Sequence, residues 1–235
     1  MVTKNNHTEL LSIFLNRFIE NTKIIIKLVS LQQMLISIHP KNPDERKIKQ
    51  VIDCLKKGGV IIYPTDTVYG IGCSIEHPEA IERICQIKNI NPLKVQLSFL
   101  CNDLSHLSEY TKAIDTPLYR FIKQLVPGPF TFILPASKKV PKLLKTKKET
   151  VGIRVPDNGI SKMILKELGH PILSTSLPLD EGEAIFSEPY LIDERFGNQV
   201  DIIIDGGEGG TIPSTIIDCC IFPPEIIRQG LGVIE

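Results

Sequence analysis

The sequence has no net charge and no long apolar run. Its 27 Lys and Arg residues balance 27 Asp and Glu residues over 235 positions, so net charge alone says little about partners. Polar side chains interrupt the apolar stretches near the N-terminus, and a membrane span of roughly 20 apolar residues is missing. With 42% hydrophobic residues, the chain is expected to form one globular α/β domain with a large core and no membrane contact.

Several common site motifs are also missing. The six cysteines form neither a CxxC pair nor a Cys/His metal spacing, so we expect no metal site and small, buried, reduced thiols. With no secretory signal beside them, a cytoplasmic location follows. There is no Walker A motif and no GxGxxG, which excludes the commonest nucleotide motifs. None of the five histidines lies in a polar turn at a strand end, so no catalytic triad is expected.

Residues 1–33 are treated as an N-terminal extension, separate from a domain over residues 34–235. Apolar residues between Leu10 and Ile19 recur at helical spacing and predict a short amphipathic helix. Two alternatives remain open. The segment is either a cleavable targeting sequence without a small-residue cleavage site, or a misassigned start upstream of Met34.

From Met34 onward, apolar strand patterns alternate with helical ones. Helices are predicted over residues 48–55, 80–87, 116–124 and 160–168. Strands are predicted over residues 35–39, 60–63, 96–101, 130–134, 152–155, 172–175, 200–204, 215–218 and 225–228. The connections are too irregular for a simple doubly wound sheet, so the predicted fold is α/β, with a twisted mixed sheet flanked by helices.

Hydroxyl and guanidinium groups gather at the predicted strand ends, where α/β folds tend to bind ligands. Small donors are offered by Thr65, Thr67, Ser176, Ser214 and Thr215, and rigid forks by Arg154 and Arg228. The glycine pairs around Glu208 suggest bare amides that cradle an anion. The alternatives are that the hydroxyls satisfy local turns and caps, and that the arginines are structural ion-pair partners.

Five segments together resemble a known family. They are residues 57–70 (KGGVIIYPTDTVYG), 127–134 (PGPFTFIL), 152–156 (GIRVP), 213–218 (PSTIID) and 227–230 (IRQG). Their order and spacing resemble the YrdC/YciO-like family of threonylcarbamoyl-AMP synthases over roughly residues 34 to 235. The segments 39–40 (HP), 100–105 (LCNDLS) and 173–177 (LSTSL) are most similar to the YciO branch.

The resemblance implies a YrdC-like fold with a concave ligand face, and a reaction. L-threonine, bicarbonate and ATP would give threonylcarbamoyl-AMP and pyrophosphate, for threonylcarbamoyladenosine (t6A) in tRNA. A carbamate oxygen would attack the α-phosphate, so positive charge and hydrogen-bond donors matter more than a general base. Mg²⁺ would bridge the ATP phosphates and be held mainly by them.

The resemblance also implies residue roles. Thr65 and Thr67 would line the threonine and phosphate pocket, with Tyr69 packed beside it. The fork of Arg154 would take the threonine carboxylate. The expected contacts near the nucleotide and adenylate are Ser214, Thr215 and Arg228. The residues expected to be catalytic are Lys88, Arg154 and Ser176.

Two positions depart from the family pattern. A Lys-x-Arg pair is expected where the chain has Lys88-Asn89-Ile90, and a Ser-x-Asn pair where it has Ser176-Leu177-Pro178. Hydrogen bonds to charged groups contribute about 1.5–3 kcal/mol each, so these losses predict weakened activity. Lys94, after a short insertion-like stretch, is a possible substitute for the missing cation.

A second hypothesis from another class is a family member that binds tRNA, rRNA or other double-stranded RNA without catalysis. Residues 138–148 hold six lysines and no acid, which suits a phosphate backbone. No aromatic RNA-binding strand motif is present, so such binding would follow shape and charge. A solvated surface segment is the simpler interpretation of the lysines.

Overall fold

The computed structural model describes residues 34–91, 97–105, 107–140, 149–177 and 187–234. The predictions about residues 1–33, Lys94, Pro178 and most of the lysine-rich segment lie outside these ranges. They therefore stay predictions.

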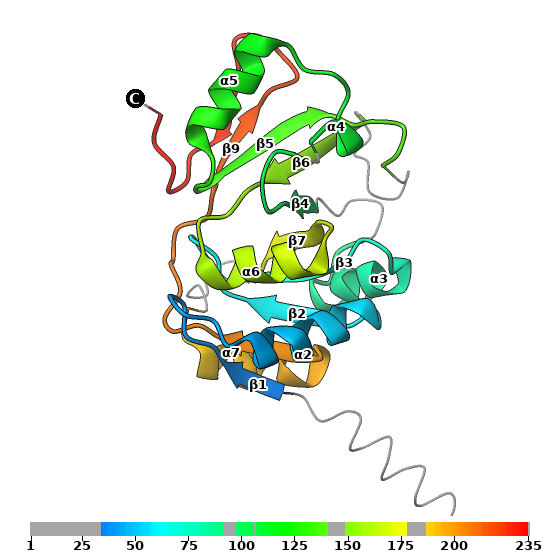
Figure 1. Cartoon of the computed structure of the whole chain (residues 1–235), viewed down its shortest axis with the longest axis vertical. Helices are drawn as coiled ribbons and strands as arrows, with labels where there is room; N and C mark the ends of the chain where they lie inside the picture. The colour runs from blue at the N-terminus through cyan, green and yellow to red at the C-terminus, as the bar shows by residue number, and fades with distance from the viewer. Residues whose placement is uncertain (1–33, 92–96, 106, 141–148, 178–186, 235) are drawn as a thin grey trace, which may run out of the picture. The chain divides into compact units, whose positions relative to one another are not determined.

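The described chain forms a mixed α/β domain around one ten-stranded sheet, which confirms the predicted fold class (Figure 1). Parallel pairs such as β1–β8 and β4–β6 lie in the same sheet as antiparallel pairs such as β2–β3 and β3–β7. The strand order is β1-β8-β2-β3-β7-β4-β6-β5-β9-β10. The strands are β1 (Met34–Ser37), β2 (Val60–Tyr63), β3 (Gly70–Ser74), β4 (Ser98–Leu100), β5 (Phe130–Pro135), β6 (Thr150–Arg154), β7 (Ile172–Ser176), β8 (Ile202–Asp205), β9 (Thr215–Asp218) and β10 (Glu225–Arg228).

Helices pack on both faces of the sheet, and alternation along β2 shows the two layers. Val60 and Ile62 belong to one apolar cluster, with residues of α3, α5 and α7, while Ile61 and Tyr63 belong to a second cluster with α2 and α6. This is the period-two pattern of a central strand. The helices are α2 (Glu45–Lys56), α3 (Pro78–Ile87), α4 (Leu107–Tyr110), α5 (Thr116–Leu125), α6 (Gly159–Leu168), α7 (Pro189–Phe196) and the 3₁₀ turn η2 (Gly197–Gln199).

Four elements were not predicted: β3, α4, α7 and the 3₁₀ turn η2. Strand β3 reads Gly-Ile-Gly-Cys-Ser, and glycine is unfavourable in strand interiors. The sheet nevertheless requires Gly72, because a Cβ there would lie 2.7 Å from Ile172 Cγ2 and 2.8 Å from the Leu173 oxygen. Close packing of β3 on β7 explains a strand that local propensity does not indicate.

Small residues form a row across four strands of the sheet. The register places Gly72 beside Ser174, Ser174 beside Ser98, and Ser98 beside Gly152. Neighbouring residues in register lie on the same face, so this row runs through β3, β7, β4 and β6. Arg154, two residues after Gly152, lies on that face too. The row of short side chains thus runs across the sheet to the strand that carries Arg154.

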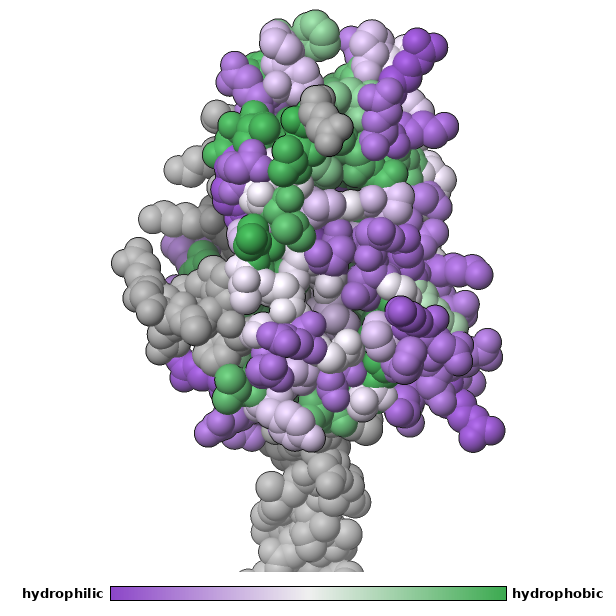
Figure 2. Space-filling view, turned by 90° about the vertical axis from the view of Figure 1, so that its left-hand side faces the viewer, coloured by the Kyte–Doolittle hydropathy of each residue, from purple (hydrophilic) through white to green (hydrophobic). Residues whose placement is uncertain are grey.

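The C-terminal segment exposes apolar side chains beside the outermost strand, β10. Seven of the ten large hydrophobic residues found exposed in the described chain lie between residues 212 and 233: Ile212, Ile221, Phe222, Ile226, Ile227, Leu231 and Val233. Figure 2 shows green, apolar atoms gathered in its upper half, on the side where Figure 1 places the C-terminus.

Among the described residues, no helix is long and apolar enough to cross a membrane.

Candidate active site

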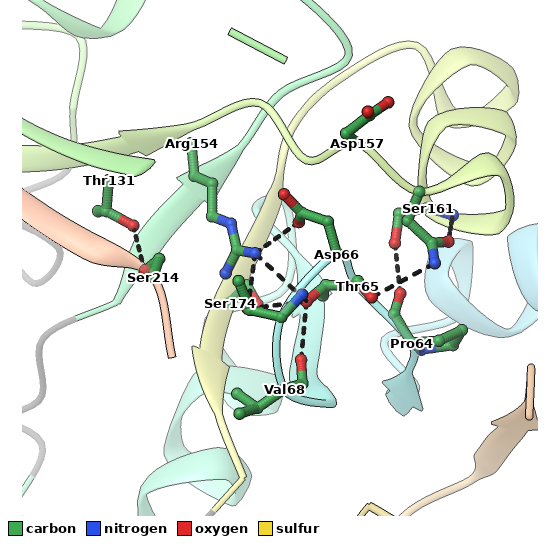
Figure 3. A network of polar contacts seen from close by, with 12 residues as sticks. Pro64, Thr65, Asp66, Val68, Thr131, Arg154, Asp157, Ser161, Ser174 and Ser214 are labelled. Carbon is green, nitrogen blue, oxygen red and sulfur yellow. Dashed lines mark hydrogen bonds and ion pairs between the residues drawn. The ribbon is translucent and has the colours of Figure 1, made fainter. Parts of the chain in front are cut away.

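The turn between β2 and β3, residues 64–69, organises the site (Figure 3). Its two strands are antiparallel, with Tyr63 paired to Gly70. Within the turn, the Thr65 hydroxyl donates to the Val68 oxygen (2.7 Å) and accepts from the Thr67 amide (3.0 Å). Thr65 therefore does satisfy its local backbone, as the structural alternative proposed. Its position beside Arg154 remains compatible with a role in binding.

The N-terminus of α6 holds the first part of this turn. The Ser161 hydroxyl donates to the Pro64 oxygen (2.6 Å), and the Asn158 side-chain amide donates to the Thr65 oxygen (3.4 Å). Asn158 also caps α6, because its side-chain oxygen accepts from the Ile160 and Ser161 amides (3.0 and 3.1 Å). The turn is thus fixed to a helix rather than left as a free loop.

The glycine segment after β8 holds the turn from another side. The Gly210 amide donates to the Thr67 oxygen (2.8 Å), and a Cβ on Gly210 would lie 2.4 Å from that oxygen. The Tyr69 hydroxyl donates to the Gly207 oxygen (2.7 Å) and accepts from the Gly206 amide (3.1 Å). Burial raises the pKa of Tyr69 to about 12. Tyr69 is therefore a neutral structural contact of the turn.

The prediction that these glycine amides cradle an anion is wrong. All four amides donate within the protein: Gly206 to the Tyr69 hydroxyl, Gly207 to the Asp205 carboxylate, Gly209 to the Ser187 oxygen and Gly210 to the Thr67 oxygen. A backbone donor already bonded inside the fold is not free for a ligand. Glycine is needed here for close approach to the turn, not for anion binding.

Arg154 joins the turn to the far half of the sheet. Its Nη2 atom donates to Asp66 Oδ1 (2.6 Å), Thr67 Oγ1 (2.8 Å) and Thr65 Oγ1 (3.3 Å). Strands β3, β7 and β4 lie between β2 and β6 in the sheet, so the turn reaches across them to meet the guanidinium. Figure 3 shows the Arg154 side chain extending from its strand toward this turn.

The Arg154–Asp66 pair is buried and incompletely satisfied. The side chains are only 11% and 10% exposed. Two of their atoms, Arg154 Nε and Asp66 Oδ2, are buried without a hydrogen-bond partner among the described residues. Leaving such atoms unpaired costs free energy, and it usually indicates a place for a ligand or an ordered water.

A second cation lies near the first. Arg228 Nη2 donates to the Ser214 oxygen (2.7 Å), and the Ser214 hydroxyl lies 2.9 Å from the Thr131 hydroxyl. Partial burial, and after it the positive charge of Arg154, lowers the pKa of Arg228. Among the ion pairs of the described chain none involves Arg228. Two guanidiniums with one nearby carboxylate leave positive charge for an anionic ligand.

Thr215 is placed differently from its neighbour Ser214. It is fully buried, its hydroxyl donates to the Gly232 oxygen (2.7 Å), and it accepts from the Gly230 amide (2.9 Å). These bonds hold the C-terminal segment against β9. The nucleotide contact of Thr215 stays a prediction, and its hydroxyl already has internal partners.

Lys88 and Ser176, the retained halves of the two altered motifs, lie together. The Lys88 ammonium donates to the Ser176 backbone oxygen (2.7 Å), and burial lowers the pKa of Lys88. Ile90, by contrast, lines a shallow pocket of about 360 Å³ with Glu82, Cys85, Gln86, Asn89 and Asn91. The structure thus brings together the retained residues of the two altered motifs.

A buried tyrosine hydroxyl also contacts β7. The buried Tyr63 hydroxyl donates to the hydroxyl of Ser174, a member of the row of small residues, and burial raises the Tyr63 pKa. Four cysteines are buried as predicted (Cys73, Cys85, Cys101 and Cys219), while Cys54 is partly buried and Cys220 is exposed.

Within the described ranges no group of three or more His, Cys, Asp or Glu residues could hold a metal ion.

The fold and this arginine-centred turn define a class of protein. The family model for Sua5, YciO and YrdC, described as "Telomere recombination", matches residues 53–230. The chain belongs to this family.

Individual relatives agree. The uncharacterised protein YciO of Escherichia coli (strain K12) is 45% identical over 199 residues, covering 84% of this chain and 96% of YciO. Its crystal structure superposes with a TM-score of 0.81 and covers 86% of this chain and 98% of that one. The threonylcarbamoyl-AMP synthase of Coxiella burnetii (strain RSA 493) is 31% identical and covers 78% of this chain and 97% of the synthase. Pyrococcus abyssi Sua5, solved with L-threonine, has a TM-score of 0.77 at 28% identity and covers 84% of this chain and 57% of Sua5.

The sequence missed one residue at the centre of the site, Asp66. The sequence feature that could have indicated Asp66 is its position between two threonines in a turn. The contact with Arg154 spans 88 positions, so no local pattern could reveal it. Asn158 and Ser161 were missed for the same reason, because their turn contacts depend on where α6 begins.

Proposed function

We propose that the chain is a threonylcarbamoyl-AMP synthase-like enzyme that uses L-threonine, bicarbonate and ATP, with Mg²⁺ carried on the ATP phosphates. The product would serve t6A formation in tRNA, in the cytoplasm. The observation that carries the proposal is Arg154, held by three acceptors of the Thr65–Thr67 turn and lying close to Arg228. The family relationship supplies the reaction class, since relatives that are 31% and 29% identical to this chain are named threonylcarbamoyl-AMP synthases.

In this proposal the residues act by binding and charge stabilisation. The threonine ammonium loses a proton, the neutral amine attacks the bicarbonate carbon, and water leaves as the carbamate forms. A carbamate oxygen then attacks the α-phosphorus of ATP, and pyrophosphate leaves. Arg154 and the Thr65 and Thr67 hydroxyls would orient the threonine, while Arg228 and Ser214 would contact phosphate oxygens. Fixed donors aimed at developing negative charge act strongly in a partly buried site.

Lys88 would support the same charge from the wall that it shares with Ser176. Its ammonium has one described acceptor, the Ser176 oxygen, and an ammonium has three protons to donate. Ile90 and Pro178 in place of the family's arginine and asparagine would lower the rate rather than abolish it, because the two arginines and the turn remain.

The test is incubation of the purified protein with ATP, bicarbonate and labelled L-threonine. The proposal predicts pyrophosphate and labelled threonylcarbamoyl adenylate, with both dependent on threonine. Absence of any threonine-dependent product, together with salt-sensitive binding of tRNA or double-stranded RNA, would contradict it and favour the RNA-binding alternative.

A further inference from the structure

We propose that Asp66 makes this site selective for an α-amino acid over the analogue that lacks the amino group. The inference rests on the proposed function and adds a specificity-determining residue to it. Asp66 faces Arg154 directly, so the site presents a carboxylate as well as a guanidinium to whatever binds there.

The local arrangement is complementary to a zwitterion. The two side chains meet at 2.6 Å and both are about nine-tenths buried. Each keeps one buried polar atom without a described partner, an acceptor on Asp66 (Oδ2) and a donor on Arg154 (Nε). An α-amino acid carries an ammonium donor and a carboxylate acceptor on the same carbon. It therefore carries the donor and the acceptor that these two atoms lack.

The net charge of the site supports the same conclusion. Arg154 and Arg228 lie close enough for the charge of one to lower the pKa of the other. Without Asp66, the two guanidiniums would attract any small anion. Asp66 neutralises the charge of one of them. A ligand with a carboxylate but no ammonium group therefore binds less favourably, and it leaves the Asp66 acceptor unpaired. Selectivity of this kind is strong, because an analogue that lacks the donor strands a buried polar group.

The experiment compares two ligands that differ by the amino group, L-threonine and 3-hydroxybutyrate, by calorimetric titration. In the wild type, L-threonine is expected to bind about tenfold or more tightly. Asp66→Asn keeps the side-chain volume and removes the charge. It is expected to weaken L-threonine about tenfold or more, and to leave 3-hydroxybutyrate unchanged or tighter. Asp66→Glu should keep the preference for L-threonine.

The matched control is Asp157→Asn. Asp157 lies near the site in Figure 3 but pairs with Lys162 at 2.6 Å and is 61% exposed, so neither affinity should change. Thermal unfolding confirms that each variant folds, and the wild-type comparison needs no variant.

Equal affinities of the wild type for the two ligands would overturn the inference. So would an Asp66→Asn variant that loses affinity for both ligands by the same factor, because Asp66 would then only hold Arg154 in place. A wild type that binds no L-threonine is a different result, which overturns the proposed function and this inference with it.

Discussion

Replacing Arg154 by alanine is expected to lower the free energy of unfolding by about 3–5 kcal/mol, because it strands a buried carboxylate. Asp66 is 10% exposed, and its only described partner is the Arg154 guanidinium at 2.6 Å. The same substitution removes a donor from the Thr67 and Thr65 hydroxyls. The loss should be much larger than the removal of an ordinary surface charge.

A matched substitution sets the scale. Lys162→Ala removes the partner of Asp157, in an ion pair of the same 2.6 Å length whose side chains are 37% and 61% exposed. An exposed pair contributes at most about 1 kcal/mol. The double variant Arg154→Ala with Asp66→Asn no longer buries a lone charge. It is expected to recover stability relative to Arg154→Ala, with a coupling of about 1–3 kcal/mol.

Urea denaturation followed by circular dichroism at neutral pH measures the free energy of unfolding of five proteins: the wild type, Arg154→Ala, Asp66→Asn, the double variant and Lys162→Ala. If Arg154→Ala costs no more than Lys162→Ala, the pair is not buried in the way the structure shows. If the double variant is as unstable as the sum of the single ones, the cost does not come from the stranded carboxylate. Either result would refute the reasoning.

Three further predictions test other parts of the structure. Ile90→Arg combined with Pro178→Asn should raise the threonine-dependent rate about tenfold or more, whereas an unchanged rate would show that these positions are not motif losses. Gly210→Ala should weaken L-threonine binding, because its Cβ would lie 2.4 Å from the Thr67 backbone oxygen in the site turn. The control is Gly207→Ala, whose Cβ would have no atom within 4 Å, so it should lower stability without changing the affinity for L-threonine. Equal L-threonine affinities of the two variants would contradict this. Burial raises the pKa of Cys101 from 9.0 to about 12, so the folded thiol keeps a proton that the unfolded chain loses. Stability should therefore fall between these values, by about 1.4 kcal/mol at pH 10 for this thiol, and urea titrations at pH 8 and pH 10 in reducing buffer should show a smaller drop in Cys101→Ala.

Much of the sheet could be predicted because its strands are strongly apolar. Strands β2, β9 and β10 begin and end where the sequence placed them. Strand β3 was missed because its glycines serve packing against β7, which is a tertiary requirement that local propensity does not reveal. Helix α7 was missed because its apolar face is narrow, with Pro189, Ile192 and Phe196 as its buried residues.

The candidate site was only partly predictable for a related reason. Thr65, Thr67 and Arg154 were proposed and do lie together, and so do Lys88 and Ser176. What the sequence could not show is which hydrogen-bond donors and acceptors already have a partner inside the fold. Backbone amides of the glycine segment look free in a sequence, but the fold assigns each of them a partner. Conversely, the unpaired atoms of Arg154 and Asp66 become visible only when every contact is placed.

The most direct test of the central claim is the rate of pyrophosphate release from ATP, measured in the wild type and in Arg228→Gln. The account predicts release that requires both L-threonine and bicarbonate. It also predicts a rate lowered about tenfold or more in the variant, which loses a cation from the phosphate side of the site. Release that is independent of threonine, or unchanged in Arg228→Gln, would contradict it.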